Sequence, residues 1–339
     1  MISKWCLKRI GYVQIFTLFY LSLASSTTAQ IVPDTSLPID SVVEKEEGNT
    51  TIINGGTAEG SNLFHSFERF NVTTGTTAYF NNVVNIQNIF SRITGNSVSN
   101  IDGMLRANGS ANLFLINPNG IIFGPNATLN VGGSFLATSA SHINFADGTQ
   151  FSTKPAQTAP LLTVSVPVGL NLESSSGKIT VQGSGHSLVG QNFRPVSGTN
   201  QLLGLRVQPG NNIFLVGGDV DLVGGLLTAP GGHIGIGSVN NGTVVLNLDN
   251  SNWALNYDKA SNFGNIGLST RSLIDTSGFG SGSIQLQGKQ ISLADGSVII
   301  IQNQGLLPSG AITLSASDSI QISGTDPIAK IPGSIRTET

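Results

Sequence analysis

The sequence predicts an all-β fold in which short strands wind into a parallel β-helix. Short apolar runs recur along most of the chain, turn-forming residues separate them, and one pattern repeats after about 28 residues, within the range of solenoid repeats. Helical periodicity is nearly absent. A β-sandwich is the main structural alternative, but it would show longer strands joined by regular hairpin turns.

The expected strands are three to six residues long, and clusters of Gly, Asn, Ser and Asp lie between them. The runs are 51–53, 78–80, 113–116, 161–166, 213–216, 244–248, 284–286, 298–301 and 312–314. Strands this short suit a chain that turns a corner every few residues, as a solenoid does.

The internal repeat is clearest near the end of the chain. Residues 282–286 (GSIQL) recur as 310–314 (GAITL), and 291–293 and 320–322 follow at nearly equal distances. Residues 177–181 and 264–268 resemble earlier copies of the same pattern. Burying one Leu or Ile contributes about 1.5–3 kcal/mol, so stacked coils offset their ordering entropy only cooperatively. The ends of such a stack expose strand edges and need caps.

The first 29 residues are predicted to be a secretory signal peptide. Lys4, Lys8 and Arg9 precede an apolar stretch over 12–23, and small residues lead to a cut before Gln30. A single membrane anchor is the alternative, but the apolar stretch is shorter than the roughly 20 residues that span a bilayer. Residues 30–48 are rich in Pro, Asp and Glu without periodicity, which predicts a flexible acidic leader.

Charge and cysteine content exclude several classes of protein. Only 10% of residues are charged, against about 25% in ordinary domains. Removing the signal takes away three of the 16 basic residues and none of the 19 acidic ones, so the formal net charge goes from −3 to 13 − 19 = −6. This balance indicates no nucleic-acid partner. Cys6, in the signal, is the one cysteine, so the mature chain has no disulfide and no cysteine-based site. No cofactor is predicted.

The most informative turn follows the run 113–116. It consists of Asn117, Pro118, Asn119, Gly120 and Ile121, and residues 124–127 repeat the x-Pro-Asn-x pattern seven residues on. Proline presets φ at the second turn position, while Asn and Gly tolerate the conformations that follow.

Three segments resemble the filamentous haemagglutinin N-terminal domain, the secretion domain of two-partner-secretion (TpsA-type) exoproteins of Gram-negative bacteria. They are residues 62–67 (NLFHSF), 89–95 (IFSRITG) and 101–126. Residues 226–239 (LLTAPGGHIGIGSV) resemble the segment that follows this domain, especially in cyanobacterial members. The resemblance runs from about residue 50 to the end of the chain. We therefore expect the secretion domain over 49–165 and a β-helix continuation over 166–339.

The resemblance implies a right-handed, pectin-lyase-like parallel β-helix with an N-terminal cap. It also implies passage through the periplasm, export by an outer-membrane β-barrel transporter, and a secreted or cell-surface product. Such a product is an adhesin with a glycan or protein receptor, not an enzyme. Two Asn-Pro-Asn motifs mark the family, and residues 117–121 match the second. The first, usually Asn-Pro-Asn-Leu, is absent, and residues 81–84 (NNVV) stand in its place.

Two interpretations of residues 117–121 remain open at this stage. The segment either forms a structural turn that orders the first coils or is recognised directly by the transporter. For the protein as a whole, a carbohydrate-active β-helix enzyme of the pectate-lyase type and the stem of a contact-dependent toxin are the alternatives to an adhesin.

Other candidate sites have weaker patterns. Asp219 and Asp221 on one strand face suggest glycosidase or calcium chemistry, although a solvated rung is the simpler interpretation. Residues 231–237 (GGHIGIG) resemble a phosphate loop but lack its following helix, which favours a β-helix corner. The histidines have no metal-ligand spacing and are expected to be structural or solvent-facing: His65, His142, His186 and His233.

Overall fold

The computed structural model describes residues 30–45, 48–154, 160–191, 194–249, 252–280, 282–308, 310–326 and 330–339. The predicted signal peptide lies outside the described residues. Within them the chain forms strands and turns and no helix. No segment of this part is therefore a helix able to cross a membrane.

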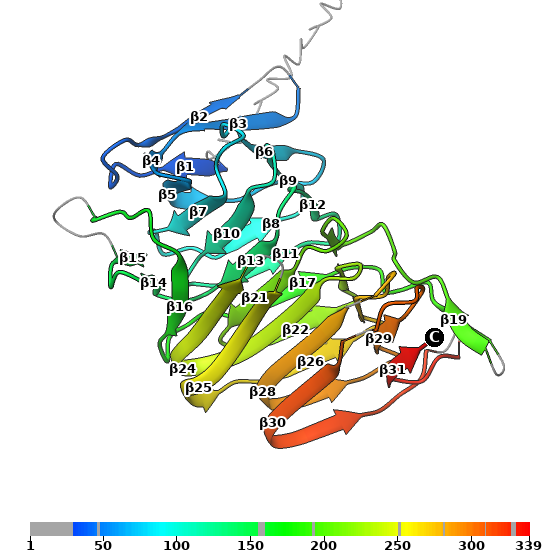
Figure 1. The fold of residues 1–339 in the computed structure, drawn as a ribbon. Coiled ribbons are helices and arrows are strands. Elements are labelled where there is room, and N and C mark those ends of the chain that lie inside the picture. The colour runs from blue at the N-terminus through cyan, green and yellow to red at the C-terminus, as the bar shows by residue number, and fades with distance from the viewer. Residues whose placement is uncertain are drawn as a thin grey trace, which may run out of the picture.

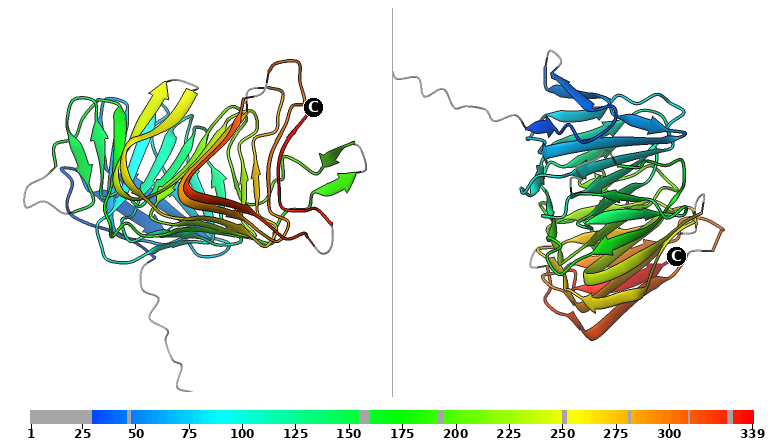
Figure 2. Two further views of the ribbon diagram at one scale, coloured as in Figure 1. Left: turned by 90° about the horizontal axis from the view of Figure 1, so that it is seen from below. Right: turned by 90° about the vertical axis from the view of Figure 1, so that its left-hand side faces the viewer.

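The strands stack coil upon coil into a right-handed parallel β-helix, as predicted, with β5 and β7 near one end and β30 and β31 at the other (Figure 1). Seen from the side, the coils form a column that runs from the N-terminal strands to the C-terminal ones (Figure 2). Each coil contributes a strand to up to three parallel sheets.

The first sheet carries the longest stack. Its parallel strands are β5 (Asn62–Phe70), β7 (Asn88–Ile93), β10 (Asn112–Ile116), β13 (Phe135–Thr138), β21 (Ile213–Gly217) and the first halves of β24 (His233–Asp249), β28 (Ser283–Leu293) and β30 (Ile312–Ile322).

The second sheet follows the first around each corner. It consists of β8 (Ser99–Ile101), β11 (Ile121–Phe123), β17 (Ile179–Gln182), β22 (Val220–Val223), β26 (Ile266–Ser269) and the second halves of β28 and β30.

The third face is built from two stacks. One holds β3 (Thr50–Gly55), β6 (Thr77–Phe80), β9 (Met104–Ala107) and β12 (Thr128–Asn130). The other holds β20 (Leu205–Arg206), β23 (Leu226–Thr228), β27 (Leu273–Asp275), β29 (Val298–Gln302) and β31 (Ser334–Glu338).

The register confirms the predicted repeat near the end of the chain. Ile284 pairs with Ile312 in the first sheet, and Ile291 pairs with Ile320 in the second, so one repeat is one coil. The prediction for the earlier copies was wrong in one respect. Residues 177–181 and 264–268 lie in the second sheet, above 291–293, because Val220 pairs with both Ile179 and Ile266. The same alternating pattern therefore serves two different faces.

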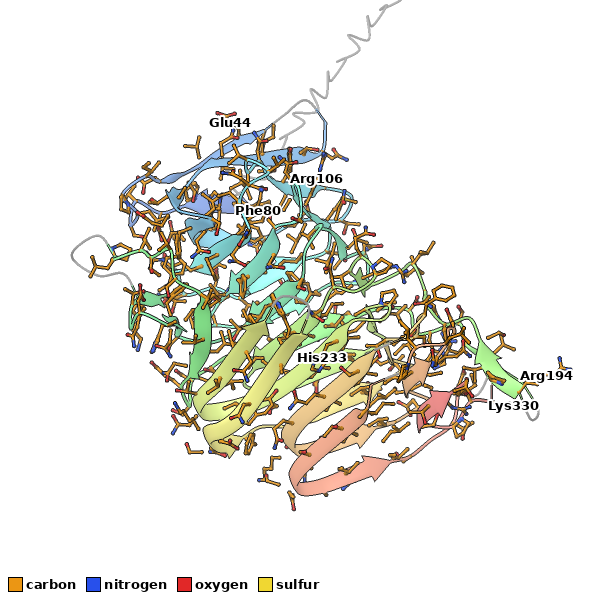
Figure 3. All side chains as sticks on the ribbon, in the orientation of Figure 1. Glu44, Phe80, Arg106, Arg194, His233 and Lys330 are labelled. Carbon is orange, nitrogen blue, oxygen red and sulfur yellow. The ribbon has the colours of Figure 1, made fainter. Side chains whose placement is uncertain are left out.

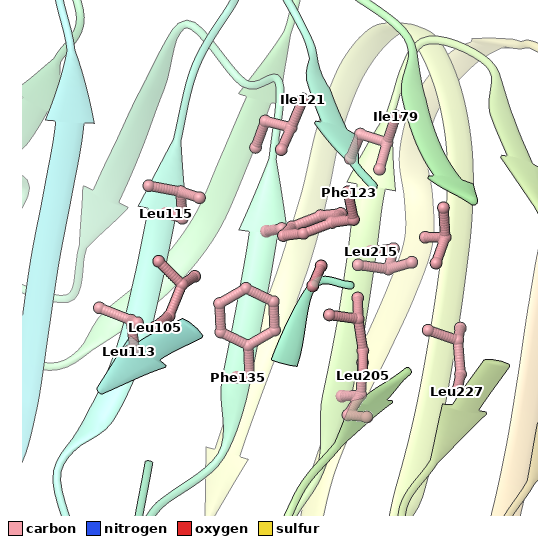
Figure 4. Close-up of a cluster of buried hydrophobic side chains, with 14 of the residues drawn as sticks. Leu105, Leu113, Leu115, Ile121, Phe123, Phe135, Ile179, Leu205, Leu215 and Leu227 are labelled. Atoms are coloured by element: carbon pink, nitrogen blue, oxygen red, sulfur yellow. The ribbon is translucent and has the colours of Figure 1, made fainter. Parts of the chain in front are cut away.

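Alternate side chains of the coils fill a continuous interior. Leu113, Leu115 and Ile121 point into it together with Phe123 and Phe135, and Leu215 and Leu227 continue the core in later coils (Figure 4). All of these side chains are fully buried. The coils are thus held together by a column of aliphatic and aromatic contacts as well as by backbone hydrogen bonds.

An antiparallel outer sheet covers part of the first sheet. It consists of β14 (His142–Phe145), β15 (Gln150–Ser152), β16 (Pro167–Leu172), the second half of β24, and β25 (Asn252–Phe263). Outward side chains of the first sheet, among them Phe64, Phe90, Phe114 and Phe214, pack beneath it in a second core. Residues 113–116 and 213–216 are therefore apolar without interruption because both of their faces are buried.

The predicted strand at 161–166 does not form, and β16 begins only at Pro167. Leu161, Val164 and Val166 are exposed instead. The Asn62 side chain donates to the carbonyls of Thr163 at 3.0 Å and Ser165 at 2.9 Å, and Ala146 N donates to Val166 O at 3.0 Å. These separate contacts take the place of a strand ladder.

The structure also corrects the prediction of a flexible leader over 30–48. β1 (Ile31–Pro33) pairs antiparallel with β5, and β2 (Ser41–Lys45) pairs antiparallel with β3. A further short strand, β4 (Thr57–Glu59), pairs with the start of β5. These strands cap the first coil and cover edges that would otherwise be exposed. Residues 30–48 show no strand periodicity because β1 and β2 are only three and five residues long.

Buried polar contacts hold this cap in place. The Arg92 side chain is 2% exposed, and its Nε and Nη2 donate to Ser66 Oγ and Ser36 Oγ, both at 2.8 Å. Asp34 accepts hydrogen bonds from Ser36, Ser66 and Thr94. Burial opposes ionisation of Asp34, but these hydrogen bonds prevail and its pKa is lowered.

The segment 231–237 combines a corner with a strand. Gly231 has φ of +64° and lies in the turn before β24, as the corner prediction required. Gly235 and Gly237 lie within β24, where a Cβ on Gly237 would be 2.6 Å from Tyr257 Oη of β25. These later glycines therefore leave room for side chains of the outer sheet and belong to no phosphate loop.

Candidate recognition turn

Residues 117–120 form a tight turn between β10 and β11, as predicted. The amide of Gly120 donates to the carbonyl of Asn117 at 3.0 Å, which closes the turn. Gly120 has φ of +109°, and a Cβ built on it would lie 2.5 Å from the carbonyl oxygen of Lys178 in the next coil. The glycine is required both by its backbone conformation and by the closeness of the neighbouring chain.

The side chain of Asn117 is completely buried inside this corner. Its Nδ2 donates to Ser97 O at 2.9 Å and to Ser99 Oγ at 3.0 Å. Its Oδ1 accepts from the backbone amide and from the side-chain amide of Asn119, each at 3.0 Å. Every polar atom of the Asn117 side chain is thus satisfied within the protein.

The turn connects three coils. Asn119 Nδ2 donates to Gly95 O of the preceding coil at 2.8 Å. The carbonyl of Pro118 accepts from Gly177 N at 2.8 Å, and Ile121 N donates to Lys178 O at 3.1 Å in the following coil. Because this corner is hydrogen-bonded to the coils before and after it, it fixes how these coils are stacked.

Only Pro118 and Asn119 of the turn are partly exposed. They border a cavity of about 220 Å³, and the Lys154–Glu173 ion pair at the end of the outer sheet lies in the same lining. The Nζ–Oε1 distance in this pair is 3.1 Å, and the hydrogen bond from Lys154 lowers the pKa of Glu173. The exposed ion pair itself contributes little to stability.

The second turn, at 124–127, has the same form. Ala127 N donates to Gly124 O at 3.0 Å, and Asn126 N donates to Asp102 Oδ1 at 2.8 Å in the preceding coil. This turn leads into β12 of the third face, just as the turn at 117–120 leads into β11 of the second sheet.

The corner at 81–84 shows what replaces the missing first motif. Asn82 is buried, and its Oδ1 accepts from Asn108 N at 2.9 Å in the next coil. Val83 and Val84 are exposed, and Ile86 N donates to Val83 O at 3.1 Å. An asparagine side chain again bridges two coils here, without a proline.

Sequence reasoning missed an asparagine ladder at the start of the first sheet. Asn88 Nδ2 donates to Asn62 Oδ1 at 2.9 Å, and Asn112 Nδ2 donates to Asn88 Oδ1 at 3.0 Å. Asn112 Oδ1 then accepts from Ser134 N at 2.8 Å, and Asn212 N donates to Ser134 Oγ at 3.0 Å. The signal was present, because Asn-(Leu/Ile)-Phe occurs at 62–64, 88–90, 112–114 and 212–214.

The alternative catalytic pair is engaged in structural contacts. Asp219 Oδ1 accepts from Asn265 N at 2.7 Å, and Asp221 forms an ion pair with Lys178. Charged side chains elsewhere are scattered: Glu44 and Arg106 lie near the N-terminal end, and Arg194 and Lys330 near the β19 (Arg194–Ser197) hairpin (Figure 3). Across the described ranges, no three His, Cys, Asp or Glu side chains gather as metal ligands.

The histidines lie at separate places in the fold. His65 is buried between Phe67 and Phe80. His186 Nε2 is 2.8 Å from Gly296 O, and His233 Nδ1 is 2.6 Å from Trp253 O. Burial lowers the pKa of all four, including the half-buried His142.

Two solved structures are similar to this chain in fold. The HMW1 secretion domain from Haemophilus influenzae has 20% sequence identity and a TM-score of 0.46, over 85% of this chain and 84% of that one. A filamentous hemagglutinin secretion domain has 15% identity and a TM-score of 0.49, over 87% of this chain and 100% of that one. No curated protein matches the chain by sequence.

The model of the TPS secretion domain family matches residues 29–286. This span includes the cap, the turn at 117–121 and the outer sheet, and extends beyond the predicted domain limits of 49 and 165. Since the match covers well over half of the chain, the protein belongs to the TPS secretion domain family, the N-terminal domain of two-partner-secretion exoproteins.

Proposed function

We propose that this protein is exported through the periplasm by an outer-membrane β-barrel transporter and folds at the cell surface, where it serves as an adhesin. The family match over 29–286 carries the export part of this proposal. The adhesive role and its glycan or protein receptor rest on the sequence resemblance alone. A carbohydrate-active enzyme is not favoured, because Asp219 and Asp221 are both engaged in contacts between coils.

The architecture fits folding that follows export. Parallel strands from successive coils pair over long sequence separations, and such contacts form slowly. A chain of this kind stays unfolded long enough to cross a narrow pore. Once the cap and first coils have formed outside, each further coil adds to an edge that already exists.

The burial of Asn117 bears on the two interpretations of the turn, namely a structural role and direct recognition by the transporter. In the folded domain a transporter reaches only Pro118 and Asn119, since Asn117 has no exposed surface. Direct recognition of Asn117 would therefore require an unfolded segment. We propose that Asn117 orders the corner as the first coils fold outside the cell, and that the transporter contacts this newly folded turn through Pro118 and Asn119.

Measurements of secretion and of folding on the same variants test these different roles of Asn117 and Pro118. The variants are Asn117→Ala and Pro118→Ala, and Asn130→Ala is the matched control because Asn130 is an exposed residue of β12. Each is expressed with its transporter, the secreted fraction is measured, and the purified domain is unfolded in urea. We expect Asn117→Ala to lower the urea midpoint and secretion together, and Pro118→Ala to lower secretion more than stability.

Two results would overturn the proposal. Loss of secretion in Asn117→Ala with an unchanged urea midpoint would show that the transporter reads the buried residue in the unfolded chain. Secretion that continues without the transporter would overturn the two-partner route itself.

A further inference from the structure

A larger cavity, of about 500 Å³, lies beside the later coils of the third face. It shares no lining residue with the cavity at the 117–121 turn. Its polar lining comes from Asn200, Arg206 and Gln304, and its apolar lining includes Phe279 and Pro230. Glycine backbone at 278 and 280 forms part of the wall, so side chains do not fill the space.

The cavity presents one uncompensated positive charge. Arg206 is the one charged residue of its lining, and no carboxylate of the described chain lies within ion-pairing distance of its guanidinium. Its Nη1 donates to Gln201 O at 3.3 Å. The remaining N–H groups suit a planar anion such as a carboxylate, which a guanidinium binds through two parallel hydrogen bonds.

A hydrogen-bond acceptor without a donor lies in the same lining. Asn200 Oδ1 is buried and has no partner in the described structure. The residue is held in the left-handed conformation, with φ of 59°, by a 2.6 Å hydrogen bond from its amide to the buried carboxylate of Asp275. Asparagine adopts this left-handed conformation more readily than most other residues.

An aromatic ring lies exposed at the same place. Phe279 lines the cavity and is 78% exposed, so its ring is open to a ligand there. The ring offers a flat apolar surface next to the cation and the amide. Aliphatic C–H faces of a pyranose ring pack well on such a surface, whereas its hydroxyls bond to amides.

We propose that this cavity binds an acidic saccharide of the uronate type. The carboxylate of one sugar unit pairs with Arg206, a ring hydroxyl bonds to the side-chain amide of Asn200 in the lining, and Phe279 packs against the C–H face of the ring. The lining contains no carboxylate to act as general acid or base, so the site binds without cleaving. This inference does not depend on the proposed export route.

Titration calorimetry on the purified protein tests the site with a hexamer of galacturonic acid as the probe. We expect saturable binding that weakens with added salt, as an ion pair requires. Arg206→Gln should weaken it at least roughly 10-fold, and Phe279→Ala by roughly 3-fold or more. Arg194→Gln is the matched control, because Arg194 is an exposed arginine on β19 outside the cavity.

Unchanged urea midpoints establish that the variants are folded. If Arg206→Gln does not fold, Phe279→Ala alone tests the site. A galactose hexamer of the same length and a peptide with a free C-terminal carboxylate separate the possible ligands. Equal binding of the neutral hexamer, or unchanged binding by the folded variants, would overturn the proposal. So would binding of the peptide in place of the uronate hexamer.

Discussion

Asn117 and Asn119 share one hydrogen-bonding system inside the corner between β10 and β11. Asn117 Oδ1 accepts from both the backbone and the side-chain amide of Asn119, each at 3.0 Å. Because Asn119 also donates to Gly95 of the preceding coil, the pair links the turn to the coil before it. The two asparagines therefore act as one unit, and neither can be replaced without affecting the other.

Asn117→Asp should destabilise the domain more than its similar shape suggests. The aspartate keeps an oxygen for Asn119 but places its second oxygen against Ser97 O, where Nδ2 now donates at 2.9 Å. A buried charge facing an acceptor costs about 3 kcal/mol or more. Urea unfolding measures the loss, and Asn130→Asp on the exposed edge is the control. Equal midpoints for the two variants would contradict the structure of this corner.

Gly120→Ala should disrupt the packing of two coils. The new Cβ would lie 2.5 Å from Lys178 O, so the backbone must move. Gly148→Ala is the matched control, since Gly148 also has a positive φ, of 86°, but a Cβ added there would meet no atom within 4 Å. We expect a loss of roughly 1 kcal/mol in the control from backbone strain, and a clearly larger loss at Gly120. Similar urea midpoints in both variants would show that the contact with Lys178 is unimportant.

Gly237→Ala should loosen the outer sheet from the first sheet. A Cβ there would lie 2.6 Å from Tyr257 Oη, and the Tyr257 side chain is buried. The ring must leave its place, which we expect to cost roughly 1–3 kcal/mol. Gly169→Ala is the control, because its nearest contact would be 3.3 Å, to Thr243 Cγ2. Quenching of the fluorescence of Trp253, which lies in the same buried cluster, should increase only in Gly237→Ala.

His65 should make the fold sensitive to acid. Burial lowers the pKa of His65 to about 3, whereas an unfolded histidine titrates near 6.5. Between these values the unfolded state binds more protons, so the contribution of neutral His65 is complete above pH 6.5 and is lost progressively down to about pH 3. Urea unfolding of His65→Phe over this range should show a flatter dependence on pH than the parent protein. An identical slope would mean that His65 is not the group responsible.

The coil repeat could be predicted from the sequence because each coil repeats the same local pattern of apolar and polar residues. The apolar runs at 113–116 and 284–286, and the turn at 117–121, depend on strand alternation and on the conformations open to Pro, Asn and Gly. The positions of these strands and of this turn depend on neighbouring residues, so they could be predicted directly from the sequence. The Asn-(Leu/Ile)-Phe triplets were equally local and would have revealed the asparagine ladder.

Other features depend on residues far apart in the chain. The cap forms because β1 and β2 find partners in β5 and β3, and nothing in the acidic composition of residues 30–48 predicts that pairing. Likewise, residues 161–166 have the composition of a strand but meet the side chain of Asn62 and the amide of Ala146 instead of a strand ladder.

The sequence by itself determined the solenoid class, the register of its last coils and the turn that marks the family. The tertiary structure alone decided that Asn117 is buried while Pro118 and Asn119 reach the surface, and that Arg206, Asn200 and Phe279 line one cavity. The physical reason is that repetition and turn preference are encoded by neighbouring residues. Burial and the meeting of side chains depend on which distant segments the stacked coils and the outer sheet bring together.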